Sequence, residues 1–173
     1  PMTAAGVRAE SSNVGTGPIG EKLADDVRYT YMKRFGWGQA TGIEMPAESD
    51  GILYPPSSWD DRTRYTTMFG QGVAGTTLQS LQVLATVANK GEQMTPYLVS
   101  RTLDPDLNEV SSTSTKVART PIDSATASSL SSLMQTAVAE GTGTSAQVSG
   151  VQGAGKTGTA ETGKDSGHTT WFL

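Results

Sequence analysis

Glycine residues stand at the ends of the patterned segments of this chain, and their placement restricts the fold to short elements. Apolar side chains recur at four-residue steps over residues 19–35, which predicts one helix that Gly36 and Gly38 end. Two further helical patterns stop at Gly91 and at Gly141. Because glycine is unfavourable inside a helix, each of these positions is the predicted end of a helical segment.

Two of these helices also have recognisable beginnings. A glycine-rich turn over residues 70–76 precedes the first helix, and Thr76 or Thr77 can cap it. For the second helix, Thr120 is the predicted cap, with Asp123 reaching back toward it. The predicted apolar face of the first helix consists of Leu78, Leu81, Leu84, Ala85 and Ala88, and that of the second of Leu130, Leu133, Met134, Ala137 and Val138.

Strand patterns are fewer than helical ones. Lys156–Ala160 is predicted to be a strand, and a second strand is expected over residues 168–173. Residues 41–45 are rich in strand-forming types and precede turn residues, so a short hairpin is expected there. Another strand is expected over residues 97–103, with a partner near Val110. The chain is therefore predicted to be a mixed α/β protein, rich in helices, with a few antiparallel strands.

The composition excludes several classes of function. The net charge is −4 and there is no basic stripe, which argues against a nucleic-acid partner. With no cysteine and one histidine, neither a disulfide framework nor a zinc site is expected, and no cofactor is predicted. No run approaches the ~20 apolar residues of a membrane helix. Pro1 is not a translation start and an apolar run reaches Leu173, so we expect a piece of a longer protein.

The polar motif Ser11-Ser12-Asn13 lies near the start of the chain, in a segment that suits a turn. A serine hydroxyl can accept and donate a proton, so Ser11 is a candidate proton relay. The amide of Asn13 has a donor and an acceptor, which suits holding a peptide group. The alternative is a helix cap, because Ser and Asn are among the residues favoured at that position.

A second motif, Lys156-Thr157-Gly158-Thr159, lies near the end of the chain. On a regular strand, Lys156 and Gly158 would point to one face and the two threonines to the other. A lysine in a cleft attracts a carboxylate, and threonine hydroxyls can donate to the same group. Gly158 would let a substrate backbone approach closely, and the Thr159 N–H could form half of an oxyanion hole. The alternative is a solvent-facing strand.

The two motifs belong to a set of stretches in a fixed order along the chain. These are Ser-Ser-Asn-Val-Gly, Phe-Gly-Trp-Gly with Thr-Gly-Ile behind it, Phe-Gly-Gln-Gly-Val, Thr-Leu-Gln followed by Ala-Asn-Lys-Gly, and Lys-Thr-Gly-Thr-Ala-Glu with a terminal Trp-Phe. Together they resemble the transpeptidase domain of class B penicillin-binding proteins, over nearly the whole chain apart from residues 104–119. The resemblance implies a fold like that of penicillin-binding proteins and serine β-lactamases, with residues 1–173 forming an incomplete transpeptidase domain.

The resemblance also implies a reaction and roles for named residues. The family reaction is acyl transfer, in which a serine attacks a D-alanyl-D-alanine stem peptide and an amine of a neighbouring strand resolves the acyl-enzyme. Ser11 would relay a proton, Asn13 would hold the substrate amide and Lys156 would supply positive potential. The implied catalytic residues are Ser11, Asn13, Lys156 and Thr159, and the implied substrate-binding residues are Thr157, Gly158, Thr159 and Gln71.

The third motif of this family, Ser-x-x-Lys, is missing from the sequence. The residues three positions before the six lysines are Ile19, Thr30, Val87, Thr113, Gly153 and Glu161. We therefore expect the nucleophilic serine and its lysine base to lie outside this chain. His168 is expected to be a surface residue at the start of a strand. Glu44, Glu48 and Asp50 suggest the solvated face of a hairpin rather than a metal site.

Two main hypotheses follow. In the first, the chain is part of a peptidoglycan D,D-transpeptidase and is inactive alone. The full-length protein would bind stem peptides and β-lactams and would work with cell-division or elongation proteins. The second is a non-catalytic relative that keeps the cleft to bind peptidoglycan or a division partner. A D,D-carboxypeptidase or β-lactam sensor shares the same motifs. Family resemblance places the full-length protein on the bacterial cytoplasmic membrane, with this domain outside and the piece itself soluble. We also expect the sheet around Lys156–Ala160 to have unpaired edges.

Overall fold

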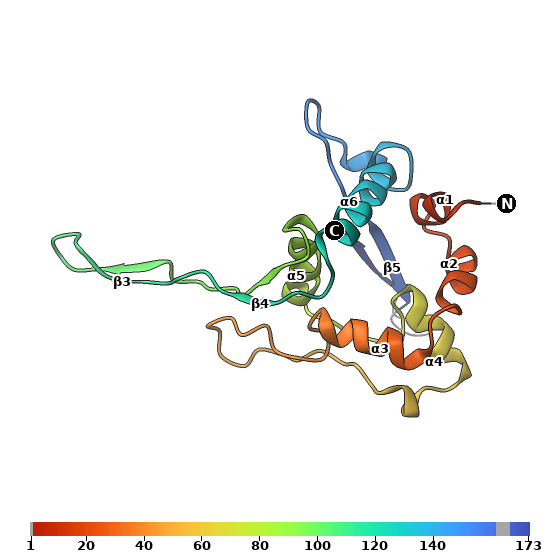
Figure 1. Ribbon diagram of the computed structural model, residues 1–173, viewed down its shortest axis with the longest axis horizontal. Coiled ribbons are helices and arrows are strands. Elements are labelled where there is room, and N and C mark those ends of the chain that lie inside the picture. The colour runs from red at the N-terminus through yellow and green to blue at the C-terminus, as the bar shows by residue number, and fades with distance from the viewer. Residues whose placement is uncertain (1, 162–166) are drawn as a thin grey trace.

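Helices fill the first half of this chain and are followed by four short strands, one further helix and two final strands, as the computed structural model of residues 2–161 and 167–173 shows (Figure 1). The α-helices are α1 (Ala4–Ala9), α2 (Asn13–Gly20), α3 (Asp25–Arg34), α4 (Asp61–Thr66), α5 (Thr77–Ala88) and α6 (Ser124–Ala139). The 3₁₀ turns are η1 (Pro56–Ser58), η2 (Thr67–Phe69) and η3 (Thr144–Ala146). The strands are β1 (Gln93–Met94), β2 (Arg101–Leu103), β3 (Glu109–Ser112), β4 (Val117–Arg119), β5 (Thr157–Glu161) and β6 (His168–Phe172).

The strands form three antiparallel pairs in the described residues: β1 with β4, β2 with β3, and β5 with β6. This confirms the predicted mixed α/β class, and β5 and β6 fall where the sequence placed them. The strand expected over residues 97–103 is shorter, because only Arg101–Leu103 pairs with the strand that contains Val110. Figure 1 shows the hairpin of β2 and β3 extending away from the helices, and every residue of both strands is exposed.

Helix α6 forms the apolar centre of the fold together with α1. Its buried residues include Met134, Ala137 and Val138, as the periodicity predicts. The predicted cap is wrong, because Asp123 and not Thr120 caps the helix by accepting a hydrogen bond from Thr126 N at 2.7 Å. Residues 120–122 precede the helix, and the backbone of Ile122 packs against the turn around Gly91.

Helix α5 begins as predicted but buries the opposite kind of side chain. Thr76 forms a complete capping box with Gln79. The predicted apolar face is wrong: Leu81 is 56% exposed, and the buried positions are polar. Gln79 Nε2 donates to the carbonyls of Gln39 and Asp50. The loops packed on α5 present unpaired carbonyl groups, and burial of such groups requires donors from the helix. The buried polar residues of α5 are Gln79, Ser80, Gln82 and Thr86.

The single helix expected over residues 19–35 is two helices, which is a further correction. Helix α2 ends at Gly20, where a β-carbon would lie 2.6 Å from Met68 Sδ, so the chain turns against η2. The side chain that α3 buries is Arg28, not an apolar one. The expected core positions are exposed by 41–49%, because the four-residue period crosses a break between two helices; they are Ile19, Leu23, Val27 and Tyr31.

No hairpin forms at residues 41–45, and this expectation is also wrong. The Glu48 carboxylate accepts hydrogen bonds from Thr41 N at 2.8 Å, from Thr41 Oγ1 at 2.5 Å and from Gly42 N at 3.2 Å. These bonds fold the segment into a loop and override its strand propensity. Glu44 accepts a bond from Leu98 N at 3.0 Å, so neither glutamate belongs to a solvated hairpin face.

Candidate active site

The strand that carries the Lys-Thr-Gly-Thr motif pairs with β6 in a regular antiparallel ladder. Residues 157–161 oppose residues 172–168 one by one. The ladder extends by one pair, because Lys156 N donates to Leu173 O at 2.7 Å and Leu173 N donates to Lys156 O at 3.0 Å. Hydrogen-bonded and non-bonded pairs alternate in such a ladder, so the Thr159 N–H points away from β6. Within residues 2–161 and 167–173, no further strand pairs with this outer edge of β5.

Ser11 and Lys156 contact each other although 145 positions separate them. Lys156 Nζ donates to Ser11 Oγ at 2.5 Å. Ser11 lies between α1 and α2 and has a φ of 52°, a left-handed conformation that serine rarely adopts. The turn continues from α1, since Ser11 N donates to Arg8 O at 3.3 Å. The strained turn thus directs the hydroxyl of Ser11 at β5.

The neighbouring serine provides the helix cap that the sequence left open. Ser12 Oγ accepts a hydrogen bond from Gly15 N at 3.1 Å and caps α2. The segment predicted to be a turn is therefore helical from Asn13 onward. Capping by Ser12 leaves the hydroxyl of Ser11 for the contact with Lys156, so the two serines have different functions.

The ammonium group of Lys156 lies in a half-buried position between two oxygen acceptors. Besides Ser11 Oγ, it donates to Thr157 O at 2.7 Å. Burial lowers the pKa of Lys156 below the ordinary value of 10.5, and the positive charge of Arg8 lowers it further. Lowering the pKa makes proton release easier, and a lysine that exchanges a proton with a hydroxyl is suited to acid–base catalysis.

Arg8 is a site residue that the sequence analysis missed. It lies on α1 and is half-buried, and its Nε atom is buried without a hydrogen-bond partner in the described part of the chain. Burial also lowers the pKa of Arg8. A single arginine in an alanine-rich helix gives no sequence signal, because its position beside Lys156 depends on how α1 and β5 pack.

Thr142 is a second residue without a sequence signal. Its hydroxyl lies 2.7 Å from Thr157 Oγ1, and its backbone N–H donates to Ala9 O at 3.1 Å. Thr142 therefore connects the end of α1, from which the serine turn follows, to the strand that carries Lys156. These two hydrogen bonds help to hold the two motifs in register.

Two other predicted residues lie apart from this contact. Asn13 is exposed at the first position of α2, and its side chain makes no hydrogen bond to any described residue. Gln71 lines a cavity of about 670 Å³ together with Ala160 and Glu161 at the far end of β5 and His168 at the start of β6. The structure therefore brings Ser11, but not Asn13, into hydrogen-bond contact with Lys156, and it locates Gln71 at the other end of the strand.

The glycine of the motif is not required by the packing of the chain itself. A β-carbon at Gly158 would lie 3.6 Å from Trp171 Cβ, which is an ordinary contact. At Gly155, in contrast, a β-carbon would lie 2.5 Å from Phe172 Cζ and 2.7 Å from Leu173 O. Gly155 is therefore needed for packing, whereas Gly158 leaves space on the face of β5 that a substrate backbone could use.

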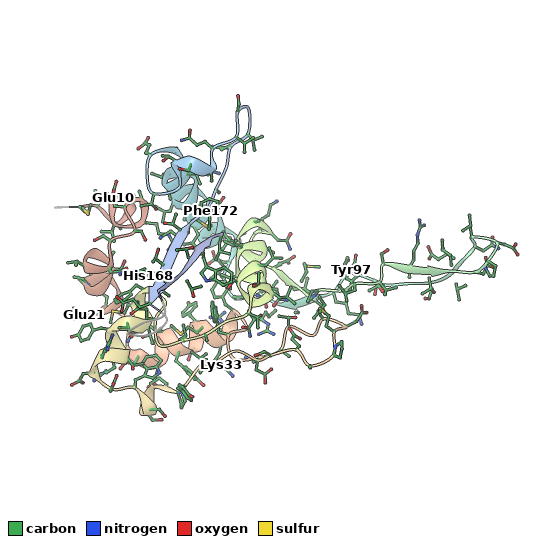
Figure 2. All side chains as sticks on the ribbon, turned by 180° about the vertical axis from the view of Figure 1, so that it is seen from behind. Glu10, Glu21, Lys33, Tyr97, His168 and Phe172 are labelled. Carbon is green, nitrogen blue, oxygen red and sulfur yellow. The ribbon has the colours of Figure 1, made fainter. Side chains whose placement is uncertain are left out.

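The site combines a hydroxyl–ammonium pair with a strand edge that presents N–H and hydroxyl donors. Figure 2 shows that the two strands run between His168 at one end of the sheet and Phe172 at the other. No cluster of acidic, histidine or cysteine side chains suited to a metal ion is found in the described residues. Among the same residues, no helix is both long and apolar enough to span a bilayer. The donors present suit acyl-transfer chemistry at a carbonyl group next to a carboxylate.

Comparison with known proteins gives a consistent result. The family described as the penicillin binding protein transpeptidase domain matches residues 1–173. Stage V sporulation protein D of Bacillus subtilis is 36% identical over 90% of the chain and 24% of its own length. PbpB of Mycolicibacterium smegmatis is 35% identical over 93% of the chain and 26% of its own length. The chain thus spans about a quarter of the length of these curated relatives.

Solved structures agree with the sequence matches. Apo penicillin binding protein 3 of Mycobacterium tuberculosis superimposes with a TM-score of 0.89 at 30% identity, over 99% of this chain and 41% of that one. The same protein has been solved in complex with ampicillin. A peptidoglycan synthetase of Bifidobacterium adolescentis has a TM-score of 0.85 at 34% identity, over 98% of this chain and 32% of that one.

Proposed function

The chain belongs to the penicillin-binding protein transpeptidase family, and we propose that it forms the substrate-holding and proton-transferring part of a peptidoglycan D,D-transpeptidase. The 2.5 Å contact between Lys156 Nζ and Ser11 Oγ carries this proposal, because it joins the two family motifs in one site. The nucleophilic serine and its lysine base would come from residues outside this sequence, which contains no Ser-x-x-Lys motif.

In the proposed reaction, the nucleophile's oxygen bonds to the carbonyl carbon of the penultimate D-alanine, and the bond to the terminal D-alanine nitrogen breaks. The leaving amine needs a proton. Ser11 would deliver it from its hydroxyl and recover one from Lys156, whose lowered pKa eases the transfer. The nucleophile's own proton passes to its lysine base in this first step. An amine of a second stem peptide then attacks the ester carbon, and the proton that this amine loses returns through Ser11 to Lys156. The lysine base gives its proton back to the released serine oxygen, which completes the cross-link.

The outer edge of β5 would bind the peptide as an added strand. Thr157 and Thr159 lie on one face of the strand, and the N–H groups of both point away from β6. The Thr159 N–H would contribute to the oxyanion hole, and the threonine hydroxyls would hold the terminal carboxylate. The open space at Gly158 supports close approach of the substrate backbone.

The same edge would accept a β-lactam, since these compounds carry a carboxylate next to the reactive carbonyl group. Asn13 and Gln71 would contact the substrate from the start of α2 and from the cavity beside Glu161. For the whole protein we propose stem peptides as substrates and division or elongation proteins as partners. We also propose a membrane anchor outside this sequence, with the catalytic domain on the extracytoplasmic side.

Covalent labelling with fluorescent penicillin tests this function. We expect no adduct on the 173-residue chain, and an adduct on a longer protein that supplies Ser-x-x-Lys. In that protein, Lys156→Ala should slow labelling by about 100-fold, the lower end of acid–base effects. The exposed Lys116, near the base of the β2–β3 hairpin, offers a matched control, and Lys116→Ala should label at the normal rate.

Three outcomes decide against parts of the proposal. A stable adduct on the chain alone would refute the missing nucleophile. Equal labelling of the Lys156→Ala and Lys116→Ala proteins would refute the role of Lys156. If the longer protein has no Ser-x-x-Lys and binds peptidoglycan without labelling, the second candidate function, a non-catalytic binding module, is correct. Comparing water and amine acceptors separates a transpeptidase from a carboxypeptidase.

A further inference from the structure

A second pocket lies at the C-terminal end of α3 and shares no residue with the site at β5. Its volume is about 460 Å³, within the range of small-ligand sites. Figure 2 shows Lys33 at the end of α3 that is far from Glu21. The pocket is lined by Tyr29, Thr30, Lys33, Arg34, Gln39, Arg119, Thr120 and Pro121.

Three of these side chains are cations, and no carboxylate lines the pocket in the part of the chain that the structure describes. Lys33, Arg34 and Arg119 form no ion pair with any residue of 2–161 or 167–173; the two ion pairs found there both involve Asp25. The whole chain has a net charge of −4, so an uncompensated group of three positive charges is a local exception. Such a group is stabilised when an anion binds to it.

The three cations meet at the end of α3 from two different elements. Lys33 and Arg34 occupy the last turn of α3, where positive side chains interact favourably with the helix dipole. Arg119 comes from β4, 86 positions from Lys33 in the sequence. It adds a third positive charge to a site that already holds two, and its contact with a terminal carbonyl of α3 leaves this concentration of charge without a counterion in the described residues.

The position of Arg119 is fixed by the fold. Its Nη1 atom donates to Lys33 O at 3.5 Å, and its register opposite Gln93 is set by the pairing of β1 with β4. The guanidinium also lies over Gly36: a β-carbon at that residue would be 3.3 Å from Arg119 Nη1. A preorganised guanidinium loses little entropy on binding a ligand, and its forked donors match the geometry of a phosphate.

The neutral residues of the pocket add further hydrogen-bond donors. Thr30 and Thr120 have hydroxyl groups, and so does Tyr29. Gln39 is held by a 3.4 Å bond from its Nε2 atom to Lys33 O, the same carbonyl that receives Arg119. We propose that this pocket binds a phosphate-bearing anion, with Lys33, Arg34 and Arg119 as its charged ligands. A dianionic phosphate balances three cations better than a single carboxylate does.

The volume of the pocket exceeds that of inorganic phosphate, so pyrophosphate is the appropriate probe. Isothermal titration calorimetry of the whole chain with inorganic pyrophosphate at low ionic strength should show saturable binding at one site. Arg119→Gln should weaken the binding by about tenfold, because it removes one charge-assisted contact. The matched control is Arg101→Gln on β2, an exposed arginine outside the pocket, which should change the affinity less than twofold.

A second variant protects the test against misfolding. Lys33→Gln removes a charge but keeps the backbone carbonyl that positions Arg119, so it should weaken binding with an unchanged circular dichroism spectrum. Three results would overturn the proposal: no saturable binding, equal losses in Arg101→Gln and Arg119→Gln, or succinate binding as tightly as pyrophosphate.

Vesicles distinguish the two sources of a phosphate group. Competition with pyrophosphate by vesicles of phosphatidylglycerol in phosphatidylcholine, but not by phosphatidylcholine alone, would support a lipid headgroup as the natural ligand. Pyrophosphate binding without such competition would support a soluble phosphate or a phosphodiester polymer.

Discussion

Two cationic groups in this molecule differ in both their burial and their surroundings. Arg28 on α3 is 8% exposed and has a counterion within the chain: it contacts the Asp25 carboxylate, donates to Arg64 O at 2.9 Å and lies 5.5 Å from the Trp59 ring centroid. Only its Nε atom is buried without a hydrogen-bond partner among the described residues. Lys156 is half-buried and is held by a hydroxyl and a carbonyl, with Arg8 as its charged neighbour.

The difference separates stability from function. A charge with an internal counterion is coupled to the fold, because removal of either partner leaves the other uncompensated. A charge beside another cation stays partly uncompensated within the chain, and perturbed groups of this kind are typical of functional sites. The predictions below test this distinction, from the largest expected change in the free energy of unfolding to the smallest.

Arg28→Met should cause the largest loss. Removal of the guanidinium leaves the Asp25 carboxylate with Arg64 alone, and it leaves the Arg64 carbonyl with only the Thr67 hydroxyl, at 3.2 Å, as a side-chain donor. We expect the free energy of unfolding to fall by about 3 kcal/mol. Urea denaturation measures this, and a change below 1 kcal/mol would mean that the Arg28 cluster is not structural.

The same cluster should respond to acid. The hydrogen bond from Arg28 is the largest cause that lowers the pKa of Asp25 below 3.8. The Asp25 carboxyl therefore binds a proton less tightly in the folded state than in the unfolded state. The stability that the ionised carboxylate contributes is lost as the pH falls from 3.8 through the lower pKa of the folded state. In Arg28→Met this acid-dependent loss should shrink.

Substitutions at Gly155 and Gly158 apply the same distinction between structural and functional residues to β5 and the residues before it. Gly155→Ala should lower the free energy of unfolding by about 2 kcal/mol, because the new methyl group overlaps Phe172 and Leu173. Gly158→Ala should change it by less than about 0.5 kcal/mol, since only an ordinary contact forms. In the longer protein, Gly158→Ala should nevertheless slow penicillin labelling. Equal stability losses at the two positions would contradict the assignment of Gly158 to substrate approach.

Lys156→Met should alter stability little, in contrast to Arg28→Met. The loss of bonds to Ser11 and Thr157 is offset by removal of a half-buried ammonium, so we expect a change within about 1 kcal/mol of either sign. Thermal or urea unfolding gives the value. A loss as large as that of Arg28→Met would show that Lys156 is a structural residue.

A weak alkaline dependence completes the series. Burial and Arg8 lower the pKa of Lys156, so the unfolded chain binds more protons than the folded chain in the pH range below 10.5. Stability should therefore rise with pH from the folded pKa up to that value. Urea unfolding of the wild-type chain and Lys156→Met between pH 7 and 10 measures the difference. A wild-type curve that falls more steeply than that of Lys156→Met would contradict the lowered pKa.

Local signals predicted elements well where one short segment decided the outcome. The capping box of Thr76 and Gln79 and the apolar face of α6 depend on residues within a few turns of one helix. The strands at residues 157–161 and 168–172 likewise match their sequence patterns. Local signals failed where distant groups competed with them, as when the Glu48 carboxylate folded residues 41–45 into a loop.

The sequence by itself determined the order of the motifs, the class of the fold and the absence of Ser-x-x-Lys, because these depend only on which residues follow one another. The tertiary structure alone decided that Ser11 and not Asn13 forms a hydrogen bond with Lys156. It also placed the positive charge of Arg8 near Lys156 and the guanidinium of Arg119 against the carbonyl of Lys33. Contacts across such distances follow from the packing of helices and strands, which no local pattern of side chains encodes.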